Sequence, residues 1–230
     1  MNILYSLGIL SAFAFLVPAV LLFFFKLYKN THLSALLLYY LLTGMYNVLT
    51  AGSIGVDKAW LGPVGVAINY LDAPLMLAAL LFFANSPAQK KLITICLYSF
   101  PVYECIIMLI FGFNSTSLVY IMAPGILCIF SFGAYYFRSY AKWSIVKNKG
   151  FGKTFMITSI LFAYGCYTMV YCFYYLQRIE AVGEVYSIYY IASLLSSVLM
   201  SIGIFKYNKR YRELSEVLVI RKELQVFFSS

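Results

Sequence analysis

Long apolar blocks alternate with short polar stretches along the whole chain, and this alternation predicts the architecture. Each block is about as long as a helix that crosses the hydrocarbon core of a bilayer, which takes about 20 apolar residues. The seven blocks cover residues 3–25, 33–54, 63–84, 92–112, 117–137, 154–176 and 185–205. The pattern therefore predicts an all-α fold, a polytopic membrane protein whose residues 1–206 form a seven-transmembrane-helix bundle.

Composition supports lipid as the solvent of this bundle. Hydrophobic residues make up 63% of the 230 positions and charged residues 11%, whereas soluble domains carry about 25% charged residues. A soluble domain of this size would leave much of that apolar surface in water. The net charge of +9 does not indicate nucleic acid as a partner, because the basic residues form no continuous patch beside aromatic residues.

The basic residues instead predict the orientation of the bundle. Fifteen Lys and Arg residues follow the first, third, fifth and seventh blocks, and two, Lys58 and Arg178, lie in the opposite connections. Basic segments stay on the cytoplasmic side of a membrane. We therefore expect the N-terminus outside and the C-terminus inside, in a plasma membrane or a bacterial inner membrane.

Residues 207–230 are expected to form a basic amphipathic cytoplasmic tail. Its apolar residues recur at helical spacing with basic residues between them: Val217, Ile220, Leu224 and Phe227, with Arg221 and Lys222. Such a helix suits the anionic lipids of the inner leaflet. Packing on a partner, or on a second copy in a homo-oligomer, is the alternative.

Two acidic residues fall inside predicted spans, which makes them candidate functional residues. Asp72 lies in the third block and Glu104 in the fourth, while no Lys, Arg or His lies well inside any block. Pro74 and Pro101, close to these acids, each free a backbone carbonyl. Without a salt bridge, desolvation favours neutral carboxyls that hydrogen-bond to Asn, Tyr or Ser side chains. A bound cation or cationic ligand is one alternative, and a purely structural hydrogen-bond network is another.

Other blocks present polar or aromatic residues on one helix face. Asn69 shares a face with Asp72, and Asn47 shares one with Thr43 and Thr50. Two longer stripes are Tyr164, Tyr167, Tyr171 and Tyr174 in the sixth block and Ser193, Ser196, Ser197 and Ser201 in the seventh. Alone, such stripes are typical of helix packing, but together they would form an aromatic-walled pocket with a carboxyl at its floor. The candidate ligand-binding residues are Asp72, Asn69, Asn47, Glu104, Tyr164, Tyr167, Tyr171, Ser193 and Ser197.

In topology and in short motifs, the chain resembles the microbial (type 1) rhodopsins. The stretch from Asp72 to Leu77 looks like the Thr-Thr-Pro-Leu-Leu-Leu stretch of the family's third helix. Residues 45–49 are similar to part of its second helix, and residues 189–205 to its seventh. The resemblance implies a seven-helix rhodopsin-like bundle.

The resemblance does not extend to the retinal site. The retinal-binding lysine would fall near Ser197 and the counter-ion aspartate of that helix near Ser193. Both tryptophans, Trp60 and Trp143, fall in predicted loops, so none is placed to sandwich retinal. A Schiff base needs a lysine amine, so we expect no covalent retinal and no cofactor beyond a non-covalently held lipid or apolar ligand.

Residues for metal or triad chemistry are scarce. His32 is the only histidine, and the five cysteines form no C-x-x-C motif. We therefore expect no metal site and no catalytic residue. Three functions remain open. The first is a non-enzymatic binding or sensor-like protein with an intramembrane pocket for a small apolar or aromatic ligand. The others are a proton- or cation-coupled carrier that uses Asp72 and Glu104, and a membrane enzyme acting on lipid. A scaffolding role without a site is the last alternative.

Overall fold

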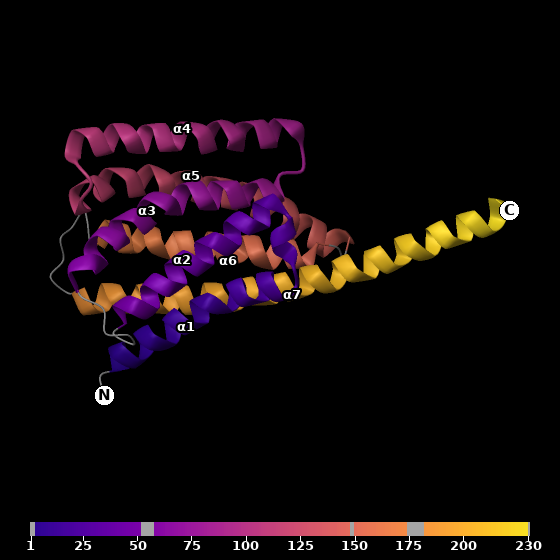
Figure 1. Cartoon of the computed structure of the whole chain (residues 1–230), viewed down its shortest axis with the longest axis horizontal. Helices are drawn as coiled ribbons and strands as arrows, with labels where there is room; N and C mark the ends of the chain where they lie inside the picture. The colour runs from indigo at the N-terminus through magenta and orange to yellow at the C-terminus, as the bar shows by residue number, and fades with distance from the viewer. Residues whose placement is uncertain (1–2, 52–57, 148–149, 174–181, 230) are drawn as a thin grey trace.

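The computed structural model describes residues 3–51, 58–147, 150–173 and 182–229 (Figure 1). In these residues the chain is helical, without a strand, and seven helices are long and apolar enough to cross a membrane. This confirms the predicted all-α class and the number of membrane-length helices. The elements are α1 (Ile3–Phe24), η1 (Leu27–Lys29), α2 (Thr31–Thr50), α3 (Lys58–Leu80), η2 (Leu81–Phe83), α4 (Pro87–Phe111), α5 (Ser115–Lys147), α6 (Phe151–Tyr171) and α7 (Val182–Ser229).

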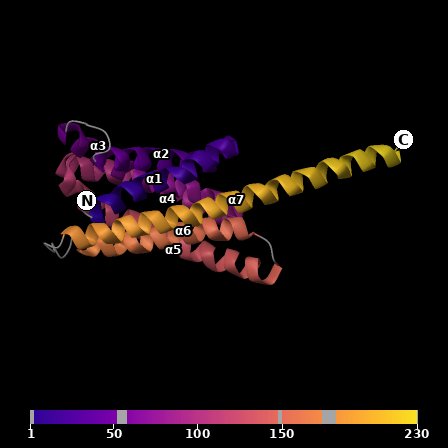
Figure 2. The same ribbon diagram turned by 90° about the horizontal axis from the view of Figure 1, so that it is seen from below.

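The helices form one bundle in which α7 is central to the packing. The most extensive helix contact is between α6 and α7, and α7 also packs on α1, while α5 packs on α6. Figure 2 shows α5, α6 and α7 running together along one side of the bundle. α4 packs on α3 and α5 and lies at the outer edge (Figure 1). The core is therefore built mainly by the other six helices.

The two ends of the bundle differ in charge. One end of the bundle holds the turn between α1 and α2 and the turn between α3 and α4. The end of α5, the start of α6 and the extension of α7 lie there too (Figure 1). We call it the basic end, because Lys26, Lys29, Lys90, Lys153 and Lys206 lie in or next to these segments. The other end, where α1 begins, is called the N-terminal end.

Local sequence signals explain where several helices begin. Before α4, the Ser86 hydroxyl accepts a hydrogen bond from Gln89 N at 3.2 Å, and Gln89 Oε1 accepts one from Ser86 N at 3.2 Å. This reciprocal pair is a capping box, and Pro87 suits the first helical position because its missing N–H would have no partner there. α2 begins in a similar way, with the Asn30 side chain accepting from His32 N at 3.0 Å.

Helix α5 continues well past the predicted end of the fifth span. It reaches Lys147, and α6 begins at Phe151, so most of the basic segment 138–153 is helical rather than a loop. The segment from 138 to 147 contains neither Gly nor Pro, and its Arg, Lys and Ala residues favour a helix. The prediction that the tryptophans lie in loops was therefore wrong: Trp60 lies in the first turn of α3 and Trp143 in α5, and both are exposed.

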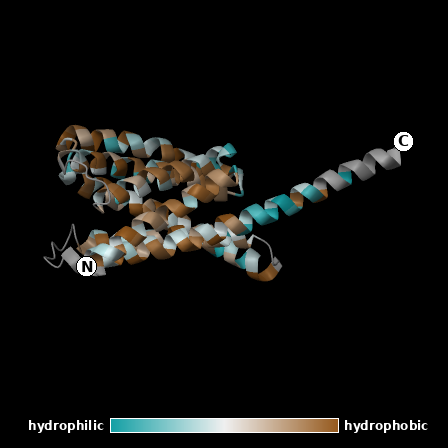
Figure 3. Ribbon diagram, turned by 60° about the horizontal axis from the view of Figure 1, so that its bottom comes forward, coloured by the Kyte–Doolittle hydropathy of each residue, from teal (hydrophilic) through white to brown (hydrophobic). Residues whose placement is uncertain are grey.

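The tail is a direct continuation of α7. The helix passes without a break through Lys206 and on to Ser229, and it leaves the bundle in a straight line (Figure 1). Its most hydrophilic stretch lies just beyond the bundle (Figure 3). On the predicted apolar face Val217 is exposed. The side chains of Ile220, Leu224 and Phe227, and that of Lys222, lie outside the described residues.

Small residues allow α6 and α7 to approach closely. A Cβ atom on Gly203 of α7 would lie 2.7 Å from Met156 N and 2.9 Å from Gly152 O, both in the α6 backbone. Ser159 Oγ donates to Ser196 O across the same interface at 2.6 Å. Small and hydroxyl side chains are typical of close helix packing in membranes.

Candidate functional site

A cavity of about 520 Å³ lies inside the bundle and reaches its N-terminal end, where Thr50 and Ala51 line it at the end of α2. Six helices contribute to it, all except α4. The described lining consists of Gly8, Ser11, Tyr39, Thr43, Tyr46, Asn47, Thr50, Ala51, Ile68, Asn69, Asp72, Met122, Ile126, Tyr164, Tyr167, Val170, Tyr171, Tyr186, Tyr189 and Tyr190. Eight of these residues are tyrosines, so the walls combine aromatic faces with hydroxyl groups.

Asp72 is the acidic group of this lining, and its partners are tyrosine hydroxyls. Tyr164 Oη donates to Asp72 Oδ2 at 2.9 Å, and the Tyr39 hydroxyl faces the same carboxyl. Both tyrosines are almost completely buried. Among the described lining residues there is no Lys, Arg or His. Two carboxyl oxygens can accept about four hydrogen bonds, so the carboxyl can accept a further donor or cation from the cavity.

Two asparagines add amide groups to the same cavity. Asn69 Nδ2 donates to Gly65 O, one turn earlier on α3, at 2.7 Å. Its side-chain carbonyl has no hydrogen-bond partner in the part of the chain that is described. Asn47 Oδ1 accepts from Tyr189 Oη at 3.3 Å, which joins α2 to α7. The cavity therefore offers acceptors at two further positions beside the Asp72 carboxyl.

The tyrosines of α6 and α7 form one continuous aromatic wall. The ring centroids of Tyr164 and Tyr167 lie 5.6 Å apart with an edge-on geometry, and Tyr167 stacks on Tyr189 at 5.6 Å. Tyr190 is 5.9 Å from Tyr189 and stacks on Tyr186 at 6.2 Å. Such offset and edge-on pairs are favourable ring geometries, so the rings hold each other in place even without a bound molecule.

Most of the predicted ligand-binding residues meet at this cavity. Asp72, Asn69 and Asn47 line it, as do Tyr164, Tyr167 and Tyr171, together with Thr43 and Thr50 from the predicted face of α2. Tyr174, the last member of the predicted tyrosine stripe, lies outside the described residues. The polar faces of α2 and α3 and the tyrosine face of α6, which were predicted for each helix separately, thus meet at one cavity.

Glu104, Ser193 and Ser197 do not line the cavity. Glu104 lies on the peripheral helix α4 and is buried, and its Oε1 has no hydrogen-bond partner among the described residues. Ser197 Oγ donates to Ser193 O at 2.6 Å, so its hydroxyl stays on its own helix. The Ser193 hydroxyl lies 3.5 Å from Tyr167 Oη and supports the aromatic wall from behind.

Several lining residues were not singled out from the sequence. Tyr186, Tyr189 and Tyr190 follow the spacing i, i+3, i+4, which marks one face of a helix and could have identified them. Tyr46 lies three residues after Thr43 on the predicted polar face of α2. Tyr39 lies among leucines, and no local pattern distinguishes it from a core residue.

No family model, curated protein or solved structure matches this chain. Among the described residues, no group of three or more His, Cys, Asp or Glu side chains is arranged to hold a metal ion. The polar groups of the described lining are the Asp72 carboxyl, the amides of Asn47 and Asn69, and the hydroxyls of its Tyr, Ser and Thr residues.

Proposed function

We propose that this chain is a multi-pass membrane protein, with its N-terminus outside and its C-terminus inside, that binds a small molecule in the aromatic cavity. The seven membrane-length helices support insertion in a bilayer. The orientation is supported by fifteen basic residues on one side of the predicted spans against two on the other. In this orientation the cavity opens toward the outside.

The ligand has an apolar or aromatic body and a basic nitrogen that faces Asp72. This proposal rests on the carboxyl of Asp72, which is partly exposed to a cavity walled by tyrosines. Its hydrogen-bond partners among the described residues are tyrosine hydroxyls. A protonated amine would form a charge-assisted hydrogen bond with the carboxylate and lie against the ring faces. A volume of about 520 Å³ falls within the range of about 300–1,000 Å³ that is typical of small-molecule sites.

A sensor-like role suits the way α7 links the two ends of the bundle. One continuous helix, α7, contains both the wall residues Tyr186, Tyr189 and Tyr190 and the extension beyond Lys206. A ligand that binds more tightly to one position of this helix would shift the population toward that position. The exposed extension would then report the state of the cavity on the cytoplasmic side.

The binding proposal is tested with pairs of compounds that differ only in the amine. Tyramine and 4-ethylphenol have the same aromatic body, and only tyramine carries the amine. We expect tyramine, but not 4-ethylphenol, to raise the unfolding temperature of the purified protein. A hydrogen bond to a charged group contributes about 1.5–3 kcal/mol, so Asp72→Asn should weaken amine binding about 10- to 150-fold.

Glu104→Gln is the matched control, because Glu104 is the other carboxyl within a predicted span and lies outside the cavity. It should leave amine binding unchanged. Equal stabilisation by the neutral and amine compounds in a panel of such pairs would contradict the proposed role of Asp72. An effect of Glu104→Gln as large as that of Asp72→Asn would contradict the proposed site.

A proton- or cation-coupled carrier is the second candidate. It is favoured by a second carboxyl within a span, Glu104, which is buried and whose Oε1 has no partner in the described part of the chain. Acids without a basic partner inside spans are typical of coupled transport. Proteoliposomes that contain a pH-sensitive dye would show uptake-linked proton movement for a carrier, and Asp72→Asn would abolish it. A binding protein would show none.

A further inference from the structure

A second cavity, of about 620 Å³, lies at the basic end. It is bounded by the turn between α1 and α2 and by the part of α7 that leaves the bundle. Lys26, Lys29 and Arg212 line it together with Phe24, Tyr207 and Tyr211, and its described lining contains no acidic residue. We call this cavity the basic groove.

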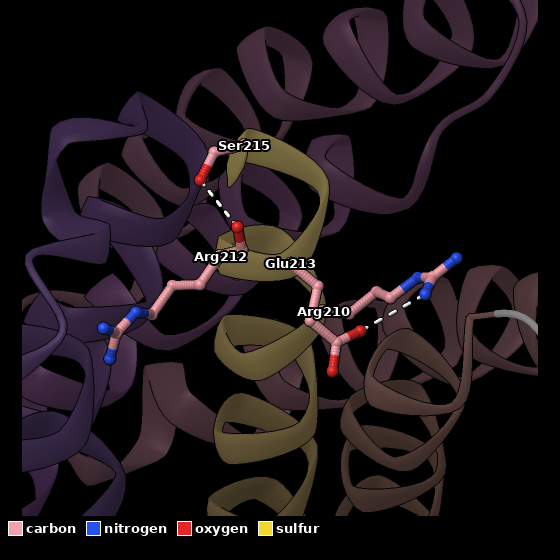
Figure 4. Close-up of polar contacts among 4 residues, drawn as sticks. All are labelled: Arg210, Arg212, Glu213 and Ser215. Atoms are coloured by element: carbon pink, nitrogen blue, oxygen red, sulfur yellow. Dashed lines mark hydrogen bonds and ion pairs between the residues drawn. The ribbon is translucent and has the colours of Figure 1, made fainter. Parts of the chain in front are cut away.

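Among the described residues, no carboxylate forms an ion pair with the basic residues of the groove. The ion pair found in the described residues joins Arg210 and Glu213, one turn apart on α7, at 3.2 Å. Figure 4 shows the Arg212 side chain pointing away from this pair. Lys26, Lys29 and Arg212 form no ion pair within the described part of the chain. Three cations therefore border one groove, and no described carboxylate pairs with them.

The aromatic side of the groove is fixed by packing between helices. Tyr207 packs edge-on against Phe82 of η2, with the ring centroids 5.1 Å apart, and stacks on Tyr211 at 6.4 Å. Phe25 contacts Phe205 at 6.2 Å and so joins α1 to α7. This side of the groove thus has defined positions before any ligand binds.

The turn that carries the two lysines has an unusual backbone. Lys26 has φ 57° and ψ 27°, in the left-handed region that residues with a side chain rarely adopt. Strained backbone of this kind often occurs at ligand sites. Here it ends α1 and starts η1, so that Lys26 and Lys29 border the same groove.

Apolar surface continues from the groove along the side of the bundle. Phe24 is 75% exposed and Phe205 is 57% exposed, and both lie where the apolar stretches of α1 and α7 give way to charged residues. A ligand with a phosphate and acyl chains matches a basic groove that continues into apolar surface. Its phosphate would meet the cations, and its chains would lie on the aromatic rings. A soluble phosphate compound would leave the apolar surface unused.

We propose that the basic groove binds the phosphate headgroup of one anionic phospholipid. Arg212 and the two lysines would donate charge-assisted hydrogen bonds to the phosphate, and basic pockets between helices at the cytoplasmic membrane face bind such headgroups. The acyl chains lie along Phe24 and Phe205. This site is separate from the aromatic cavity, so its test does not depend on the small-molecule ligand.

The test uses the full-length protein in a neutral detergent, titrated with fluorescent short-chain phosphatidylglycerol. Each basic residue near a lipid phosphate is expected to strengthen binding about fivefold, so Arg212→Gln should weaken it about fivefold. Arg210→Gln is the matched control, because Arg210 lies two residues away on the same exposed helix and pairs with Glu213. It should leave the affinity unchanged, and Arg212→Lys should keep most of it.

Three results would overturn the proposal. Equal weakening by Arg210→Gln would mean that the lipid follows the general charge of α7 rather than the groove. Equal binding of phosphatidylcholine would show that no anionic headgroup is recognised. Competition by glycerol 3-phosphate at the concentration at which the lipid binds would assign the groove to soluble phosphate compounds instead.

Discussion

Replacing Gly203 with alanine tests the close contact between α6 and α7, on which the aromatic wall depends. The added Cβ would lie 2.7 Å from Met156 N and 2.9 Å from Gly152 O. Both atoms belong to the α6 backbone, so a side-chain rotation cannot relieve the contact. α7 must move away from α6 instead.

The size of the effect follows from these distances. An ordinary van der Waals separation is about 3.5 Å, so the 2.7 Å contact requires α7 to move by about 0.8 Å. A gap of that size loses roughly a quarter to a half of each dispersion contact along the interface. Overpacking costs about 1–3 kcal/mol, while alanine in a helix gains about 0.5–1 kcal/mol over glycine. We therefore expect Gly203→Ala to lower the free energy of unfolding by about 1 kcal/mol, within limits of about 0 and 2.5 kcal/mol.

Gly133 supplies a control of opposite sign. It lies inside α5 and faces α6, and its added Cβ would meet the Leu161 side chain at 3.6 Å, an ordinary contact. Gly133→Ala should therefore stabilise the protein by about 0.5–1 kcal/mol. The assay is reversible unfolding in mixed micelles by increasing the SDS fraction, followed by tryptophan fluorescence. A gain of stability in both variants would contradict the close backbone contact between α6 and α7 at Gly203.

Three further substitutions separate structural residues from residues of the cavity. Lys153→Met should lower the free energy of unfolding by about 1.5–3 kcal/mol in the same titration. The reason is that Lys153 Nζ donates to Phe82 O at 3.1 Å and lies 4.3 Å from the centroid of the Phe82 ring. Unchanged stability would contradict that contact. Glu104→Gln should change the free energy of unfolding by less than about 1 kcal/mol, since Glu104 Oε1 has no partner among the described residues to lose, and a large loss would reveal one. Gly65→Ala should alter ligand affinity with little change in stability, because the added Cβ would displace the Tyr46 hydroxyl, which lines the cavity. The same affinity as the wild-type protein in a binding titration would place Tyr46 away from the ligand.

Hydropathy predicts the number and place of the helices but not where the last ones end. The predicted spans overlap all seven membrane-length helices. α5 and α7 run beyond the apolar stretches, because a helix ends at a backbone signal and not at the first charged residue. For α5 the next glycine is Gly150, with φ 82°. No glycine or proline follows Gly203 in α7, so the helix continues through the basic stretch.

Helix-face patterns predict part of the cavity but not its limits. Asp72, Asn69, Asn47 and the α6 tyrosines were found because the spacing within one helix puts them on one face. Which faces meet is decided by the rotation of each helix in the bundle, and short local motifs do not contain that information. Glu104 and the serines of α7 satisfy the same patterns and yet lie outside the cavity.

Native mass spectrometry of the protein, released from gently solubilised membranes, tests the central proposal most directly. The wild-type chain should carry one defined non-lipid molecule whose exact mass fits an elemental composition that contains nitrogen. Asp72→Asn should lose this molecule while it keeps its bound phospholipid and its fold. The same bound mass on the Asp72→Asn variant, or wild-type protein that carries only heterogeneous phospholipid, would contradict a small-molecule site built around Asp72.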